Sequence, residues 1–234
     1  MYNIIELLKT NPYPGRGILL GCSEDGGSAV MLYFIMGRSV NSRNRVFERT
    51  NDGIRTKAFD PALLTDPSLV IYQPVRVSNG RTIVTNGDQT DTINEHLLSG
   101  KSFHDALLTR QYEPDMPNYT PRISGIVEQN GSYSLSILKT ADGTPACCQR
   151  CFFEYSAPIP GLGHFISTYK TDGDPLPAFT GEPFPVNIAI SNGLERFAWS
   201  VWEALNDENK VSLYAREVKL TTGESADLII NKNV

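Results

Sequence analysis

Short strand-like runs separated by hairpin turn signals limit the folds that this chain can adopt more than any other feature of its sequence. Several of these runs alternate polar and apolar residues, as half-buried strands do. Turn sequences such as Asn51-Asp52-Gly53 and Ser78-Asn79-Gly80 stand between them. Turns this close in sequence favour antiparallel sheets over a doubly wound parallel sheet. The predicted strands span 17–22, 29–37, 43–48, 69–77, 81–85, 133–139, 147–155, 164–170 and 210–220.

Helical signals are fewer, and they lie between or after the strands. Thr92 followed by Glu95 resembles a capping box, and Ser102 followed by Asp105 resembles a second one. A third helix is predicted across residues 193–206, where apolar residues recur at intervals of four. Two antiparallel sheets with separate helical layers therefore predict an α+β domain.

Composition and charge exclude several classes of protein. The formal net charge is -5, which argues against a general nucleic-acid binder. No stretch approaches 18 uninterrupted apolar residues, so we expect no membrane span. The first residues do not place a basic region before an apolar core, so no secretory signal is predicted. We therefore expect an intracellular, cytoplasmic protein.

Basic charge gathers in one window, residues 37–49, which holds four arginines, one glutamate and no lysine. Two interpretations stay open. The window could be an edge strand with solvated charges. It could also be an anion site, because the planar guanidinium group suits phosphate oxygens better than an ammonium group does.

Three of the four cysteines lie in the sequence CCQRC, residues 147–151. Cys148 and Cys151 have the C-x-x-C spacing of zinc and redox sites. No second C-x-x-C or paired histidine completes a tetrahedral site. We therefore predict buried strand thiols and no metal.

The polar stretch in IVTNGDQTDTI, residues 83–93, connects a predicted strand to a predicted helix. It matches neither a calcium loop nor a phosphate-binding P-loop. Free N–H groups at a helix N-terminus can hold an anion, and a plain turn is the alternative. The side chains that would assist are Asn86, Asp88, Thr90 and Asp91.

A second polar stretch, residues 111–123, contains Glu113, Arg122 and three prolines. Proline restricts its own φ and the residue before it, so this segment is stiff. It could hold side chains in a site, or it could be a rigid connector. Tyr72 ends another apolar run and could equally be a core tyrosine. The proline-rich connection at 171–187 either crosses the surface passively or covers a site.

Five motifs occur together in order, and their order and spacing carry a family resemblance. They are GRS and SR within 37–43, IY at 71–72, NGDQTDTI at 86–93, YEPD and TPRI within 112–123, and ISTY at 166–169. Together they resemble the archaeal-type inosine monophosphate (IMP) cyclohydrolase family, from about Gly15 through AREV at 215–218. The resemblance implies the four-layered αββα fold of the N-terminal nucleophile hydrolases. It also implies one domain over 1–234, in which residues 1–15 are an N-terminal extension.

The activity that this resemblance implies is closure of formylated aminoimidazole carboxamide ribonucleotide (FAICAR) to IMP, with loss of water. The carboxamide nitrogen attacks the formamide carbon of the same molecule, so no cofactor or metal is expected. Holding the two groups in attack geometry lowers the barrier. Donors aimed at the formyl oxygen stabilise the charge that develops there, and protons must leave the nitrogen and reach the oxygen.

We assign roles to particular residues as hypotheses. Glu113 is the first candidate for proton transfer, and Tyr72 is a hydroxyl donor to the formyl oxygen. Arg43, supported by Arg38, would contact the phosphate or the carboxamide, and Asn86 would meet the substrate at the strand-end turn. The other expected substrate-binding residues are Gly87, Asp88, Thr90, Asp91 and Arg122.

Two other functions stay open. The chain could carry out a different amidohydrolase or nucleotide cyclisation reaction, because a fold does not set its function. It could also be a non-catalytic nucleotide-binding paralogue. The expected partner in each case is a small nucleotide such as FAICAR or IMP, not nucleic acid or a membrane. A homo-oligomer is compatible with the sequence, which does not give the oligomeric state.

Overall fold

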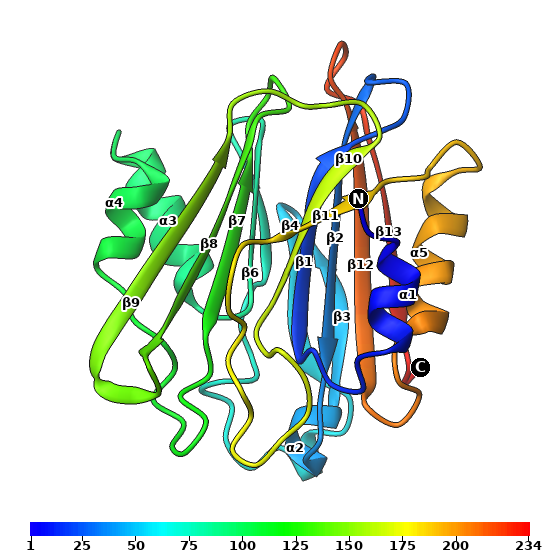
Figure 1. Cartoon of the computed structure of the whole chain (residues 1–234). Coiled ribbons are helices and arrows are strands. Elements are labelled where there is room, and N and C mark those ends of the chain that lie inside the picture. Colours follow the sequence, from blue (N-terminus) through cyan, green and yellow to red (C-terminus); the bar gives the residue numbers. More distant parts are fainter.

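Two antiparallel sheets lie face to face in the computed structural model, which describes residues 1–234 (Figure 1). The six-stranded sheet has the order β11 (Phe184–Asn187), β10 (Leu162–Ser167), β1 (Arg16–Cys22), β2 (Ser28–Met36), β12 (Lys210–Lys219) and β13 (Ser225–Asn231). The seven-stranded sheet has the order β3 (Arg45–Thr50), β4 (Gly53–Ala58), β5 (Val75–Ser78), β6 (Arg81–Thr85), β7 (Arg122–Val127), β8 (Tyr133–Ala141) and β9 (Thr144–Tyr155).

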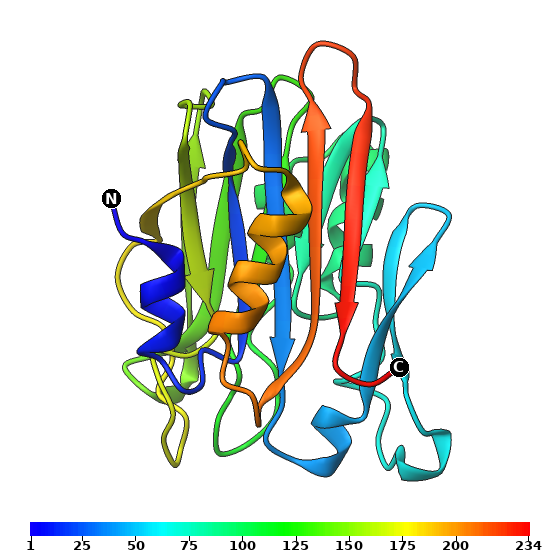
Figure 2. The same cartoon turned by 90° about the vertical axis from the view of Figure 1, so that its right-hand side faces the viewer.

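Helices cover the outer face of each sheet. Helices α1 (Ile4–Lys9) and α5 (Leu194–Ala204) lie side by side on the six-stranded sheet (Figure 2). Helices α3 (Gln89–Leu98) and α4 (Phe103–Leu108) cover the seven-stranded sheet (Figure 1). The short helix α2 (Val40–Arg43) lies at one end of the sandwich, and a 3₁₀ turn spans Pro61–Leu63. No helix of this chain is both long enough and apolar enough to cross a membrane.

Three hydrophobic cores separate these layers. Leu20 of β1 belongs to the core between the sheets, whereas its neighbour Leu19 belongs to the core beneath α1 and α5. Successive side chains of a strand point to opposite faces, so a strand covered on both sides is apolar throughout. This explains why every residue of β1 and β2 is buried. The third core joins α3 and α4 to the seven-stranded sheet.

Most of the predicted strands are confirmed, and the runs at 43–48, 69–77 and 164–170 are strand only in part, the last because β10 ends at Ser167. The runs at 17–22, 29–37, 81–85, 133–139 and 210–220 correspond to β1, β2, β6, β8 and β12. In the run 69–77 only β5 forms, because Pro74 has no N–H to donate to a ladder. The run at 43–48 begins within α2, so β3 starts at Arg45.

Two of the helix predictions are confirmed and one is wrong. The capping box of Ser102 and Asp105 is confirmed at the start of α4, and α5 lies within the predicted range 193–206. The capping box of Thr92 and Glu95 is wrong, because α3 already begins at Gln89. The polar turn enters the helix one turn earlier than the sequence pattern indicates.

The prediction of buried cysteines in CCQRC is wrong. Strand β9 is the edge of its sheet, and Cys147 is exposed while Cys148 and Cys151 are half-buried. Cys148 packs toward the core under α3 and α4, and Cys151 packs toward the core between the sheets. Residues three apart on a strand point to opposite faces, so these two thiols do not form a pair. No group of three or more His, Cys, Asp or Glu residues could hold a metal ion.

Candidate active site

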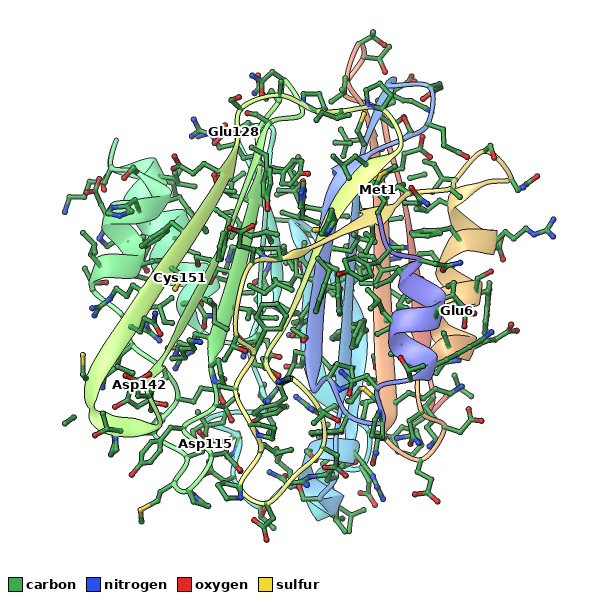
Figure 3. All side chains as sticks on the ribbon, in the orientation of Figure 1. Met1, Glu6, Asp115, Glu128, Asp142 and Cys151 are labelled. Carbon is green, nitrogen blue, oxygen red and sulfur yellow. The ribbon has the colours of Figure 1, made fainter.

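A cluster of buried charged and hydroxyl groups lies at one end of the sandwich, the lower end in Figure 1. β1 and β7 begin at this end, and β6 and β10 finish there. Figure 3 labels Asp115 at the same end, two residues after Glu113. We call this group the buried cluster, and each member is at most 9% exposed. Its members are Arg16, Tyr33, Arg45, Tyr72, Asn86, Glu113, Arg122 and Tyr169.

Glu113 is the acid of the buried cluster. Its peptide N–H donates to the Thr120 carbonyl at 2.9 Å, which fixes the backbone of the stiff segment. Its carboxylate has one long contact, 3.5 Å from Asn86 Nδ2. Burial raises the pKa of Glu113 to about 7, although Arg16 and Arg122 oppose the shift. A carboxyl group with this pKa can take up and release a proton near neutral pH.

Asn86 is held rigidly beside that carboxylate. Its Oδ1 accepts hydrogen bonds from the Ile123 N–H at 2.8 Å and from Gln89 Nε2 at 3.1 Å. Its Nδ2 donates to the Pro121 carbonyl at 2.9 Å. Because the side-chain amide is fixed on both sides, it ties the end of β6 to the start of β7 next to Glu113.

Two arginines of the buried cluster present N–H groups without a protein acceptor. Arg45 donates from Nε to the Ser42 carbonyl at 2.8 Å, but its Nη1 is buried and unpartnered. The Nε of Arg16 is also buried without a partner. Buried donors are almost always hydrogen-bonded in proteins, so these two N–H groups stand out as donors that lack a protein acceptor. Burial lowers the pKa of Arg45. Burial also acts to lower the pKa of Arg16, but Glu113 and the nearby tyrosines together outweigh it and raise that pKa.

Tyrosine hydroxyls complete the buried cluster. The hydroxyl groups of Tyr72 and Tyr33 are 2.9 Å apart, and those of Tyr169 and Thr120 are 2.6 Å apart. Burial raises the pKa of Tyr169 to about 12, and it also raises the pKa of Tyr33. These two phenols are therefore neutral near pH 7.

Arg122 joins the buried cluster to the polar turn at 86–93. Its Nη1 donates to Gln89 Oε1 at 2.6 Å and lies 2.7 Å from Asp88 Oδ1. Asp88 also pairs with Arg110. Burial opposes ionisation of Asp88, but the two arginines together lower its pKa below the ordinary value. The turn is thus ordered by the guanidinium that lies across it.

Gly87 leaves the space that Arg122 occupies. A Cβ at this position would lie 2.5 Å from Arg122 Nη1 and 2.7 Å from Gln89 Oε1. We expect Gly87→Ala to displace Arg122 and to lower the free energy of unfolding by about 1–3 kcal/mol in urea titrations. Gly27→Ala is the control, because its methyl group would meet only the exposed Asp25 carboxylate, at 3.3 Å. Equal stability of the two variants would contradict this account of Gly87.

Thr90 and Asp91 lie outside the buried cluster. The Thr90 hydroxyl is 2.6 Å from that of Thr85 and donates to the Gly87 carbonyl at 3.1 Å. Asp91 accepts a hydrogen bond from Arg76 Nε at 2.8 Å near the surface. Through these contacts both residues anchor the first turn of α3 to neighbouring parts of the protein.

Three of the four arginines of the basic window lie near this end of the sandwich, in different positions, and the fourth, Arg49, pairs with Asp227. Arg43 donates to the Gly37 carbonyl and to Asn209 Oδ1, both at 2.9 Å, near the surface. Arg38 pairs with Asp172 at 2.7 Å and lies over the ring of Tyr13, which stacks on Tyr169 of the buried cluster. Arg45 is the member of this window that the structure places among the buried groups.

Two connecting segments lie across this end of the sandwich, 111–121 and the part of the proline-rich connection at 171–187 that precedes β11 (Figure 1). Asn118 Oδ1 accepts a hydrogen bond from the Leu176 N–H at 3.0 Å, which links the two segments. Phe179 is buried, and its carbonyl accepts from Lys139 Nζ at 3.0 Å. The connection is therefore packed against the sandwich beside the segment that carries Glu113.

A family model described as IMP cyclohydrolase-like protein matches residues 13–223. The chain belongs to this family. An IMP cyclohydrolase of Methanosphaera stadtmanae is 31% identical over 163 residues, which is 68% of this chain and 74% of the relative. An IMP cyclohydrolase of Methanopyrus kandleri is 29% identical over 161 residues, which is 67% of this chain and 75% of the relative. The predicted family is thus confirmed.

Four members of the buried cluster were not among the predicted site residues of this IMP cyclohydrolase-like chain. Arg45 and Tyr169 lie within recognised stretches, the basic window and the ISTY motif. Arg16 is a single charge directly before an apolar strand, which could have been noticed as a strand-end residue. Tyr33 lies inside an apolar run, and nothing in the sequence separates it from a core residue.

Proposed function

We propose that this chain closes FAICAR to IMP with loss of one water molecule. Membership of the IMP cyclohydrolase-like family and the names of its relatives support this reaction. The structural observation that carries the proposal is Glu113, a buried acid with a pKa of about 7 beside two arginine N–H groups that have no protein partner. This combination suits a reaction that needs proton transfer and stabilisation of a developing negative oxygen.

The reaction requires two protons to move from nitrogen to oxygen. The carboxamide nitrogen forms a bond to the formamide carbon and loses one proton, and the formyl oxygen becomes negatively charged. The carbon–oxygen bond then breaks, and the formamide nitrogen loses a second proton. Both protons leave on the departing oxygen as water. No electrons are transferred to an external acceptor.

We assign the proton transfer to Glu113. Its ionised form would accept a proton from the carboxamide nitrogen and return it to the departing oxygen. Because about half of the carboxyl groups are ionised near pH 7, both forms are accessible during turnover. Asn86 would act as a positioning residue that fixes the carboxylate.

We assign stabilisation of the formyl oxygen to Arg16, Arg45 and the Tyr72 hydroxyl. The two arginines contribute the buried N–H groups that lack an acceptor. Such donors act strongly because they are fixed and shielded from water before the reaction begins. Arg45 replaces Arg43 as the arginine of the basic window that we assign to the substrate, because the guanidinium of Arg43 already donates to Gly37 and Asn209.

We also propose that the layered α+β architecture is the αββα fold of the N-terminal nucleophile hydrolases. One domain over 1–234 suits this proposal, because the family match includes strands of both sheets. A cytoplasmic location would suit nucleotide synthesis.

The test is to mix the purified chain with FAICAR, without added metal or cofactor, and to follow IMP formation by absorbance and chromatography. We expect closure far above the rate without protein. If the folded chain produces no IMP, the proposed reaction is wrong. Calorimetric titration with IMP would then separate a nucleotide-binding paralogue from a protein that acts on another compound.

A further inference from the structure

Three side chains, one of them in the buried cluster, form a continuous line of hydrogen bonds. The Tyr169 and Thr120 hydroxyl groups are 2.6 Å apart, and the Thr120 hydroxyl donates to Asp115 Oδ2. Asp115 Oδ1 accepts from the Thr120 peptide N–H at 2.6 Å, so both oxygens of this carboxylate are used by one residue. We call Tyr169, Thr120 and Asp115 the hydroxyl chain.

The carboxylate at its end fixes the direction of every proton in the hydroxyl chain. An ionised carboxylate accepts hydrogen bonds and donates none, so the single proton of the Thr120 hydroxyl lies toward Asp115. The Thr120 oxygen can then only accept from Tyr169, so the phenol proton lies toward Thr120. Burial keeps that proton on the phenol, because it raises the pKa of Tyr169 to about 12. The Tyr169 oxygen therefore offers lone pairs, and no proton, to any other group beside it.

The Tyr169 hydroxyl has a fixed position next to the acid of the buried cluster. Its ring stacks on Tyr13 with 5.9 Å between the ring centres. Thr120, which the phenol contacts, also accepts a hydrogen bond from the Glu113 peptide N–H at 2.9 Å. Glu113 and Tyr169 both act electrostatically on Arg16. The phenol oxygen and the Glu113 carboxylate therefore border one region around this guanidinium.

We propose that Asp115 is a positioning residue, which acts through Thr120 to hold Tyr169 as an acceptor for the N–H of the attacking carboxamide nitrogen. The proposal rests on the proposed function, since it takes that nitrogen to react beside Glu113. The carboxamide nitrogen carries two protons. Glu113 removes one of them and Tyr169 holds the other, so the nitrogen is oriented before it attacks. The second proton remains on N1 of IMP, where it still donates to Tyr169.

The test compares IMP with adenosine monophosphate (AMP) in calorimetric titrations near pH 7.5. N1 of IMP carries a proton, whereas N1 of AMP is an unprotonated acceptor, so wild type should bind IMP more tightly. Asp115→Asn reverses the protons, because asparagine Oδ1 can still accept from the Thr120 N–H while its Nδ2 donates to the Thr120 oxygen. Thr120 then donates to Tyr169, whose own proton turns toward the ligand. The preference for IMP over AMP should fall at least about tenfold.

Further variants separate the direction of the protons from charge and from stability. Asp142→Asn removes an exposed carboxylate at the same end of the sandwich and should keep the wild-type preference (Figure 3). Thr120→Ser retains the hydroxyl chain and should also keep the preference, whereas Thr120→Val breaks the chain and should lose it. In a Tyr169→Phe background, Asp115→Asn should cause no further change, because the acceptor is already absent.

Three results would overturn the proposal. One is a wild-type chain that binds neither nucleotide, or that binds AMP as tightly as IMP. Another is an Asp115→Asn variant with a native thermal midpoint and the wild-type preference. The third is a loss of preference that is equally large in the Tyr169→Phe background, since Asp115 would then act through its charge. If the preference follows the hydroxyl chain but FAICAR is not closed, the acceptor role of Tyr169 stands and the proposed reaction falls. If FAICAR is closed and the preference ignores the hydroxyl chain, the reaction stands and this proposal falls.

Discussion

Replacing Glu113 with glutamine is expected to lower kcat for FAICAR closure by about 10²- to 10⁴-fold. Glutamine keeps the size and polarity of the side chain but cannot transfer the proton. The control is Glu128→Gln, at the opposite end of the sandwich (Figure 3), where the carboxylate pairs with Arg81. The control should retain wild-type kcat. If Glu113→Gln turned over at the wild-type rate, another group would have to transfer the proton.

The same substitution separates two effects of pH. If ionised Glu113 is the base, the wild-type rate rises with pH through a midpoint of about 7 and then levels off. Stability runs the other way, because the folded-state pKa of this acid lies above the unfolded value. The folded chain binds the extra proton, so this group's contribution is full below pH 4.5 and is lost as pH rises to about 7. Urea titrations of wild type and of Glu113→Gln over this pH range measure the contribution of Glu113 to the free energy of unfolding.

Replacing Arg16 with methionine is expected to lower kcat at pH 7 by at least about 100-fold. The change removes both an N–H donor of the buried cluster and the first positive charge that opposes the raised pKa of Glu113. The midpoint of the pH–rate profile should therefore move above its wild-type position. Arg81→Met, which removes the half-buried partner of Glu128, is the control and should change neither quantity.

Stability measurements give a second test of the pairing between Arg16 and Glu113. A buried carboxylate without its counter-charge costs about 3–5 kcal/mol. We therefore expect Arg16→Met to be destabilised mainly at pH values where Glu113 ionises. The double variant Arg16→Met with Glu113→Gln should recover much of that loss. If the two substitutions were simply additive, or if Arg16→Met kept the wild-type pH profile, the two groups would not be coupled.

The hairpin pattern was enough to predict much of the fold. Strands β1, β2, β6, β8 and β12 were predicted because their local periodicity and flanking turns agree with the sheets they join. Strand β7 was not predicted, since its residues follow the proline-rich polar segment and pair with β6 and β8 on either side. The thiols of β9 were predicted to be buried because sequence does not reveal which strand lies at an edge.

The residues of the candidate site could be selected only in part from the sequence, for physical reasons. Glu113, Asn86, Arg122 and Tyr72 were selected because polar residues next to stiff or apolar segments stand out in a sequence. Arg43 and Arg45 are two residues apart in the same window, and only the folded chain decides which guanidinium is buried. Burial depends on the strands that pack against a side chain, and those strands are distant in sequence.

The sequence by itself determined the antiparallel α+β plan, the cap of α4 and the family, because these depend on local patterns and on the order of short motifs. The tertiary structure alone decided that Arg16, from the first strand, acts electrostatically on Glu113, and that Arg110, Arg122 and Arg150 line one hollow. The raised pKa of Glu113 is likewise a property of the assembled layers. Desolvation and charge act through space, so groups far apart along the chain acquire their chemistry only when the sheets close over them.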